Sequence, residues 1–278
     1  MTRIARLEKI GICAALMLCF GGGYGLGTAF AAPPPPLNVS MHRALYTMSL
    51  DSADTTSGVD GASGSLYYEW GDSCDGWTIQ QRYKLWIHYR QDQPVELTSN
   101  YVTWESKDGT HFRFNDRETR NGVVDQDIRG EASLDGQGGS GTASFEKPKH
   151  LQFALPPGTL FPTAHTLALI RAGLAGQRYL AAQVFDGSVI DGASAVSAVI
   201  GHTQPPQSGD VKSALLQHQN WQIWLAFFSE ATKEIPPDYA LGMRMLENGV
   251  SDDMAIDYGN YTIKATMQSI EALPKPAC

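Results

Sequence analysis

Apolar and polar residues alternate along much of this chain, which is the pattern of β-strands that bury one face. The clearest example is the stretch 65–89, whose second half places Leu85 and Ile87 on one face and Lys84 on the other. Its two halves are joined by the polar, glycine-containing segment 71–76, which is typical of a turn. The pattern therefore predicts a long antiparallel hairpin.

The same alternation recurs from residue 44 to residue 270. It predicts strands at 44–50, 98–105, 111–114, 123–132, 141–147, 151–155, 179–185, 195–200, 240–246, 254–258 and 261–270. The aromatic run 221–228 could line one side of a helix, but prolines on either side favour a strand, which we expect to be buried on both faces. Residues 51–63 are rich in Ser, Thr, Asp and Gly and predict a solvated loop. About thirteen strands result, so the fold class is mainly β.

One helix interrupts the strands. It is expected to begin at Pro162 and to run to about residue 175, with Leu167, Ile170 and Leu174 on its apolar face and Gly176 as its stop. His165 lies in its first turn, where we expect the imidazole to pair with loop carbonyls or helix-end groups rather than to act as a ligand or base.

The first 31 residues have the features of a secretory signal. A basic start precedes an apolar run that is too short for a membrane span, and Ala31 ends an Ala-x-Ala cleavage site. We therefore expect cleavage after Ala31, residues 32–278 as a single domain, and a periplasmic location. An alternative makes Cys19 a lipid-anchored N-terminus, although Leu18 is larger than the residue that this processing prefers.

The charge and the cysteines narrow the classes of function. The chain of 278 residues carries a net charge of −8 with histidine neutral, which disfavours binding to nucleic acid or to an anionic lipid surface. Cys74 and Cys278 are the cysteines that remain after cleavage, and an even pair in an oxidising compartment predicts a disulfide. Neither has a second Cys or His at ligand spacing, so no metal site or cofactor is predicted.

A set of short motifs resembles the EipB-type family of cell-envelope integrity proteins, which are exported proteins of Gram-negative bacteria. The motifs are His42-Arg43-Ala44, Cys74-Asp75-Gly76-Trp77, the run from Leu155 to His165 that begins Leu-Pro-Pro-Gly, Val184-Phe185-Asp186-Gly187, Glu247-Asn248-Gly249-Val250, Asp257-Tyr258-Gly259, Glu271-Ala272-Leu273-Pro274 and Cys278. Their order covers nearly all of residues 32–278.

The resemblance implies a curled antiparallel sheet, a β-spiral or broken barrel similar to lipoprotein carriers, with one packed helix. It also implies a disulfide between Cys74 and Cys278, in agreement with the cysteine count. It brings no catalytic residue with it. The residues themselves show no Gly-x-Ser-x-Gly motif, so an envelope hydrolase is disfavoured.

Tryptophans supply the remaining candidate site. A curved sheet could turn several of them toward one concave groove, for which we name Trp77, Trp86, Trp104, Trp221 and Trp224, although core packing is the default explanation. We expect a non-enzymatic periplasmic protein that supports envelope integrity by binding an envelope protein or another envelope component. The alternative is a carrier that shields a lipid or lipoprotein acyl chain in that groove.

Overall fold

The computed structural model describes residues 37–149, 151–207, 209–229 and 236–278, and Leu37–Cys278 forms one compact unit. The predicted leader, its cleavage site after Ala31 and the alternative anchor Cys19 lie outside the described residues. Within the described residues, no helix is long and apolar enough to cross a membrane.

Strands dominate the described chain, with one α-helix and one short 3-10 helix. The strands are β1 (His42–Ala53), β2 (Val59–Asp72), β3 (Gly76–Tyr89), β4 (Val95–Ser106), β5 (His111–Arg120), β6 (Val123–Leu134), β7 (Gly141–Lys147), β8 (Leu151–Leu155), β9 (Thr159–Leu160), β10 (Tyr179–Val184), β11 (Ser194–Ile200), β12 (Asn220–Phe228), β13 (Tyr239–Leu246), β14 (Ser251–Asp257) and β15 (Tyr261–Ala272). The α-helix is α1 (Pro162–Leu174), and the 3-10 helix is η1 (Ala214–Leu216).

All fifteen strands belong to one sheet, ordered β8 to β1 and then β15 to β9. From β1 the chain steps outward, strand by strand, to the edge strand β8. It then reaches the other edge strand, β9, through residues 156–158 alone. Because so short a link spans little distance, the sheet must curl until its edges meet there. The result is a nearly closed, barrel-like sheet with an unsealed seam between β8 and β9.

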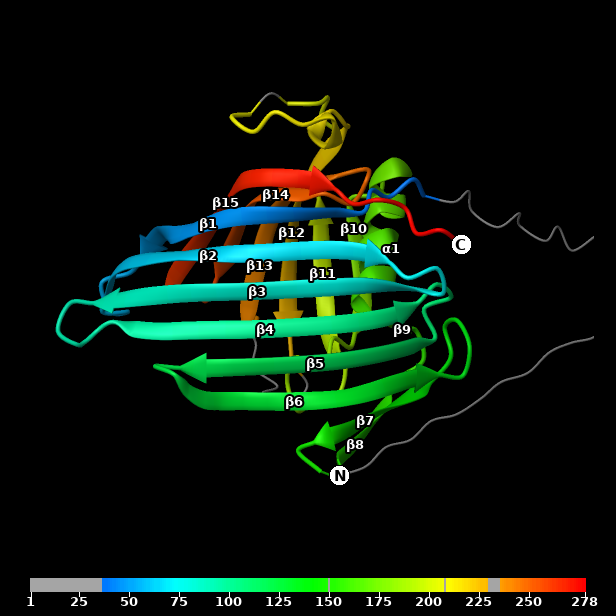
Figure 1. The fold of residues 1–278 in the computed structure, drawn as a ribbon, viewed down its shortest axis with the longest axis horizontal. Coiled ribbons are helices and arrows are strands. Elements are labelled where there is room, and N and C mark those ends of the chain that lie inside the picture. Colours follow the sequence, from blue (N-terminus) through cyan, green and yellow to red (C-terminus); the bar gives the residue numbers. More distant parts are fainter. Residues whose placement is uncertain (1–36, 150, 208, 230–235) are drawn as a thin grey trace, which may run out of the picture. The chain divides into compact units, whose positions relative to one another are not determined.

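Strand direction accounts for the seam. Figure 1 shows β3–β6 running across the picture, while β10–β12 run up and down behind them. Strands that cross cannot align their N–H and C=O groups in a ladder, so the two edges approach without pairing. Among the described pairs only β9 and β10 are parallel, and α1 makes the crossover between them.

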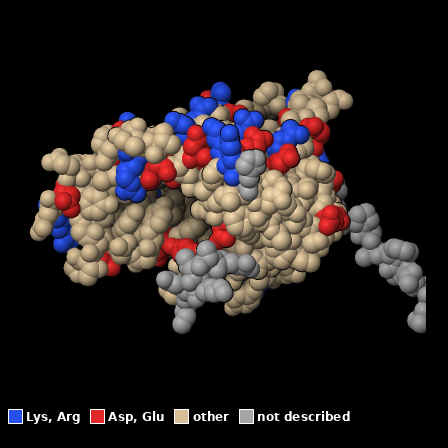
Figure 2. All heavy atoms as spheres, turned by 90° about the horizontal axis from the view of Figure 1, so that it is seen from below, with Lys and Arg blue, Asp and Glu red and all other residues tan. Residues whose placement is uncertain are grey.

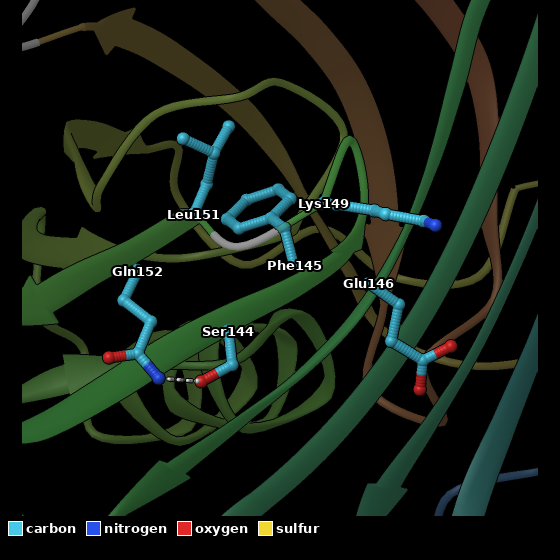
Figure 3. Close-up of a pocket in the computed structure, with 6 residues that line it drawn as sticks. All are labelled: Ser144, Phe145, Glu146, Lys149, Leu151 and Gln152. Carbon is cyan, nitrogen blue, oxygen red and sulfur yellow. Dashed lines mark hydrogen bonds between the residues drawn. The ribbon is translucent and has the colours of Figure 1, made fainter.

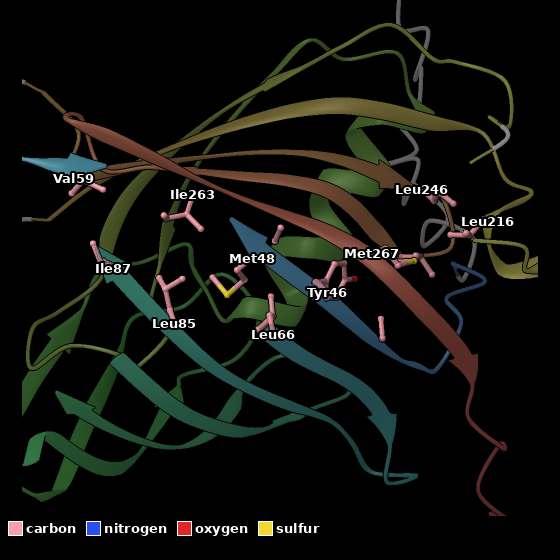
Figure 4. Close-up of a cluster of buried hydrophobic side chains, with 13 residues drawn as sticks. Tyr46, Met48, Val59, Leu66, Leu85, Ile87, Leu216, Leu246, Ile263 and Met267 are labelled. Atoms are coloured by element: carbon pink, nitrogen blue, oxygen red, sulfur yellow. The ribbon is translucent and has the colours of Figure 1, made fainter. Parts of the chain in front are cut away.

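The two faces of the sheet have different characters. On β3, Ile79, Leu85 and Ile87 point to the face that we call inner, where they are buried, whereas Arg82 and Lys84 point to the opposite, outer face and are exposed. One apolar cluster on the inner face joins β1–β3 to β15 through Tyr46, Leu66, Ile263 and their neighbours (Figure 4). Since β1 pairs with both β2 and β15, this cluster holds together the middle of the sheet.

Helix α1 packs against the inner face on two sides. Leu169 and Ile170 join the cluster formed by β10–β13, while Leu167 packs against the cluster of Trp70 and Ile79 on β2 and β3. The helix therefore lies between strands from both halves of the sheet. Its close approach to β12 needs Gly173, because a Cβ at this position would come within 2.7 Å of the Trp221 ring.

A phenylalanine cluster and one loop join the two sides of the seam. Phe112, Phe114 and Phe145 of β5 and β7 pack against Phe161 and Phe185, which come from the segments before α1 and after β10. Residues 185–193, which we call the clasp loop, run from β10 to β11. The loop is held by two hydrogen bonds across the seam, described with the site below.

Three predictions about the elements were wrong in whole or in part. Residues 51–63 are mostly strand, because pairing of the end of β1 with β15 and of the start of β2 with β3 outweighs their low strand propensity, and only residues 54–58 form the turn. Of the predicted apolar face of the helix, Ile170 is buried and Leu167 packs on the inner face as expected, but Leu174 is exposed, and Leu169 and Gly173 are buried instead. The run 221–228 is strand β12, as predicted, but only one of its faces is buried.

Candidate binding surfaces

The sheet register divides the five candidate tryptophans between the two faces. Trp77 and Trp221 point inward, whereas Trp86, Trp104 and Trp224 point outward. Pairing explains the division, since Trp104 faces Thr78 across the ladder while Trp77 faces Glu105, and alternate residues lie on opposite faces. The structure therefore does not bring the five together in one groove.

Of the two inward tryptophans, Trp221 belongs to the core, whereas Trp77 is partly buried and has the Lys107 ammonium 2.9 Å from its ring centroid. Trp221 is 1% exposed and its Nε1 donates to Thr203 Oγ1 at 3.0 Å. Trp77 packs edge to face on the buried Trp70, with ring centroids 5.9 Å apart. Together with α1, these rings cover part of the inner face.

Two of the outward tryptophans are covered by cations. The ammonium of Lys84 lies 5.5 Å from the centroid of Trp86, and the guanidinium of Arg113 lies 4.7 Å from that of Trp104. These are cation–π contacts at the surface, worth about 0.5–1 kcal/mol each. No such contact is found for Trp224 among the described residues.

The N-terminus of α1 is held by a buried carboxylate that the sequence analysis did not single out. Both oxygens of Glu105, on the inner face of β4, accept backbone N–H groups, from Thr163 and Ala164 at 2.7 Å each. Glu105 is 2% exposed, and burial raises its pKa to about 7 in spite of these two donors. One signal in the sequence could have indicated such a partner. The N-cap residue Phe161 has no side-chain acceptor, so the first N–H groups of the helix need an acceptor from elsewhere in the chain.

We expected His165 to pair with loop carbonyls or helix-end groups, but its Nε2 makes no such hydrogen bond. The side chain is buried, and Nε2 has no hydrogen-bond partner among the described residues. Burial lowers the pKa of His165 to about 4, so the imidazole is neutral at physiological pH. Its position on the inner side of α1 makes it a core side chain.

The clasp loop is hydrogen-bonded to side chains from the other side of the seam. Tyr101 Oη donates to Asp186 O, and Gln126 Nε2 donates to Ser188 O, both at 2.6 Å. The same Gln126 also donates to the buried Asp116, whose pKa is raised by burial. These bonds join β4 and β6 to the loop after β10, so they fasten the two sides of the seam.

The seam leaves the edge strand β8 unpaired on one side. Residues 151–155 read Leu-Gln-Phe-Ala-Leu, with no charge, no proline and no bulge, and they pair only with β7 among the described strands. Exposed edges in natural sheets are usually protected by charges, prolines or bulges, because unpaired N–H and C=O groups accept another strand. Here only the flanks, at Pro148 and Pro156, carry such protection.

A depression of about 700 Å³ lies beside this edge, at the β7–β8 hairpin. Figure 3 shows its lining, with the apolar side chains of Phe145 and Leu151 on one side, Ser144 and Gln152 joined by a hydrogen bond, and Lys149 and Glu146 apart from them. Apolar side chains next to free strand groups suit an extended peptide, whose backbone would pair and whose side chains would fill the depression.

Histidine partners among the described residues are structural in kind. His42 bonds the carbonyl of Ser40, His111 bonds Thr110, and His218 pairs with Glu247. Among the described residues, no group of three or more His, Cys, Asp or Glu is placed to hold a metal ion.

The predicted cysteine pair is joined in the structure. Cys74, in the turn between β2 and β3, and Cys278 form a disulfide with Cα atoms 5.9 Å apart. The chain just before it follows β1, since Leu273 N donates to Met41 O. The C-terminal segment is thereby attached to the tip of the hairpin that the alternation predicts.

These features define a class of protein: a curled, barrel-like antiparallel sheet with a helix on its inner face, an open edge strand and a terminal disulfide. The profile of the EipB-like family matches residues 34–274, and the chain belongs to this family. It is 29% identical over 263 residues to the cell envelope integrity protein EipB of Brucella abortus (strain 2308), covering 92% of this chain and 91% of the relative.

A solved structure supports the same fold. A crystal structure of a β-barrel-like protein, a domain of unknown function from Brucella abortus, matches with a TM-score of 0.80 and 28% identity. The match covers 86% of this chain and 100% of that one. The predicted family and the predicted curled β fold are both confirmed.

Proposed function

We propose that this protein is an exported, non-enzymatic protein of the periplasm that supports cell-envelope integrity by binding another envelope protein along strand β8. The envelope role rests on its similarity to the Brucella protein, whose name states that role. The binding mode rests on one observation above all: β8 is an uncharged edge strand with an unpaired side, next to a depression into which Phe145 and Leu151 bring apolar surface.

The chemistry of the edge indicates an extended segment of protein as the ligand. Such a segment can add a further strand, with backbone hydrogen bonds providing affinity and the depression selecting its side chains. An acyl chain has no groups to pair with the edge. The inner face supports the carrier hypothesis less well, because α1, Trp77 and Trp221 occupy it.

A single charge on the edge tests the binding mode. Ala154 is exposed on β8, and Ala154→Lys places a charge on the outer face of the edge strand, beside the position of an added strand, which opposes strand addition. We expect the wild type to be cross-linked to an envelope protein in intact cells and the variant not to be. Expressed in a strain that lacks the gene, the variant should leave the cells as sensitive to detergent as they are without it. Its folding can be checked by circular dichroism.

The matched control lies in the same row of the sheet. Ser133 of β6 faces Thr142 of β7, which faces Ala154, so the three side chains share the outer face. Ser133→Lys adds the same charge to a strand whose two sides are already paired, and it should restore detergent tolerance fully. Equal cross-linking and equal detergent tolerance for the two variants would refute the β8 interface. Normal detergent tolerance in the deletion strain would refute the envelope role itself.

A further inference from the structure

The outer face of β10–β13 carries an uncharged row of residues that includes two exposed aromatic side chains. Tyr179 pairs with Val199, Val199 with Trp224, and Trp224 with Gly242, so these four residues, which we call the platform, run side by side across four strands. Tyr179, Val199 and Trp224 are 75%, 47% and 49% exposed. A contiguous apolar surface of this kind on a protein marks an interaction site.

The adjacent row is also uncharged. Ala181, Ser197, Ala226 and Ala240 face one another in the next register. By contrast, the outer face of β5–β7 carries ion pairs between neighbouring strands, such as Arg129 with Glu146. Figure 2 shows many of the charged side chains along the upper side of the molecule in this view and others at its left end, lower centre and right, with uncharged areas between them.

The orientation of Trp224 can be read from its contacts. A Cβ at Gly242 would come within 2.7, 2.8 and 2.9 Å of Cζ3, Cη2 and Cε3 of the indole. Three ring atoms at nearly equal distance mean that the ring lies flat over Gly242, with its other face turned to solvent. Trp86 and Trp104, in contrast, each have a cation against the ring.

A flat, open indole face suits a ligand that stacks on it. The face of an aromatic ring carries partial negative charge and attracts C–H groups, and the faces of sugar rings present such groups. The backbones of Tyr179 and Trp224 lie two strands apart, which corresponds to about 10 Å, and the Trp224 ring extends further, over Gly242 on β13. Two exposed aromatic side chains in one row therefore suit an extended ligand that offers several sugar rings.

The surroundings disfavour an anionic lipid surface. The net charge of the chain is negative, and the platform is bordered by Asp257 beside Ala240, and by Arg244, which is paired with Asp252. Surfaces that bind anionic membranes usually have unpaired Lys and Arg around the aromatic residues. A neutral ligand fits this border better.

We propose that the platform binds a glycan strand by stacking its neutral sugar rings on Trp224 and Tyr179. This surface is separate from the β8 edge, and the inference does not depend on the proposed protein partner. It assigns the outer face of β10–β13 to contact with the polysaccharide of the envelope.

The test uses the full mature chain and two probes, a β-1,4-linked N-acetylglucosamine hexamer and isolated peptidoglycan sacculi. We expect the hexamer to change the tryptophan fluorescence of the wild type, and the protein to co-sediment with sacculi. Trp224→Ala should weaken hexamer binding roughly tenfold, as is typical for loss of one stacking side chain. Tyr179→Ala, at the most exposed position, should weaken it as well with little effect on folding.

Trp104→Ala is the matched control, since it removes an outward tryptophan whose ring is covered by Arg113. It should bind both probes like the wild type. The proposal is overturned if the wild type binds neither probe, or if Trp104→Ala and Trp224→Ala lose binding equally. It is also overturned if Trp224→Ala instead abolishes self-association or binding to phospholipid vesicles while glycan binding is unchanged.

Discussion

Glu105 shows how one buried carboxylate can position a helix inside a sheet. The first N–H groups of a helix lack partners within it, and in α1 the N-cap residue Phe161 offers no side-chain acceptor. Glu105 supplies two acceptor oxygens from β4, and its negative charge lies where the helix dipole is positive. The entry point of α1 is therefore set by a residue more than fifty positions earlier in the chain.

We expect Glu105→Ala to lower the free energy of unfolding by about 2–4 kcal/mol, because two buried N–H groups lose their acceptors. Glu105→Gln keeps one acceptor oxygen and should cost less. Thermal unfolding near pH 7 compares them, with Glu131→Gln on the exposed face of β6 as control. Melting temperatures equal to that of the wild type for both Glu105 variants would contradict this role.

The same residue should affect the pH dependence of stability. Its pKa of about 7 lies above the ordinary value of 4.5, so in the window between them the folded state keeps a proton that the unfolded state releases. The free energy of unfolding should therefore fall as the pH rises through this window. Glu105→Gln cannot titrate, and its melting temperature should fall less than that of the wild type. If the melting temperatures of the two proteins fell in parallel as the pH rises, the raised pKa of Glu105 would be contradicted.

At the scale of the elements, the clasp loop explains why the motif Val-Phe-Asp-Gly occurs at 184–187. Phe185 enters the phenylalanine cluster, and Asp186 closes a local turn by accepting N–H and O–H of Ser188. Gly187 has a φ of +68°, and a Cβ there would lie within 3.0 Å of the Phe114 ring. Both conformation and space require glycine at this position.

Gly187→Ala should therefore lower the free energy of unfolding by about 2–3 kcal/mol, from backbone strain and overpacking against Phe114. For a chain of this size that corresponds to a melting temperature lower by roughly 4–12 °C. Gly192→Ala in the same loop is the control, because its Cβ would meet nothing within 4 Å and its φ is not positive. Similar losses for both variants would refute the specific packing of Gly187.

The strands also show where local patterns stop being informative. Alternation located nearly every long strand, because a period of two is a local property of a half-buried strand. It did not locate β9, whose two residues, Thr159 and Leu160, form a strand only by pairing with β10. The aromatic composition and flanking prolines of β12 suggested burial on both faces, but Trp224 on its outer face is left exposed by the rest of the fold.

At the scale of the molecule, the disulfide links an early turn to the C-terminal segment. Cys74 and Cys278 are 204 residues apart, and closing so long a loop restricts the unfolded chain. Chain-entropy arguments assign such a link up to about 5 kcal/mol, although measured gains are often smaller. The sheet is also held by α1 and by the clasp loop, so the disulfide adds to contacts that already close the fold.

Cys278→Ser should lower the melting temperature under non-reducing conditions and make the segment after β15 sensitive to protease. The melting temperature falls because the unfolded chain regains the conformational entropy that the disulfide restricts. The segment becomes accessible to protease because it is no longer attached to the hairpin tip. Wild-type protein treated with a reductant should behave like the variant. An unchanged melting temperature without reductant, or two free thiols in the intact mass of native protein, would contradict the prediction.

The sequence by itself determined the β class of this protein, the start and length of its helix, its family, and the cysteines that pair. The β class, the helix and the cysteine pair follow from local periodicity, from turn and cap chemistry, and from the two cysteines outside the predicted leader, whereas the family was recognised from short motifs. The tertiary structure decided which edge stays open, which tryptophans face outward, and which carboxylate receives α1. Each of these depends on the order of strands in the sheet, and that order is set by contacts between residues far apart in the chain, which no local pattern records.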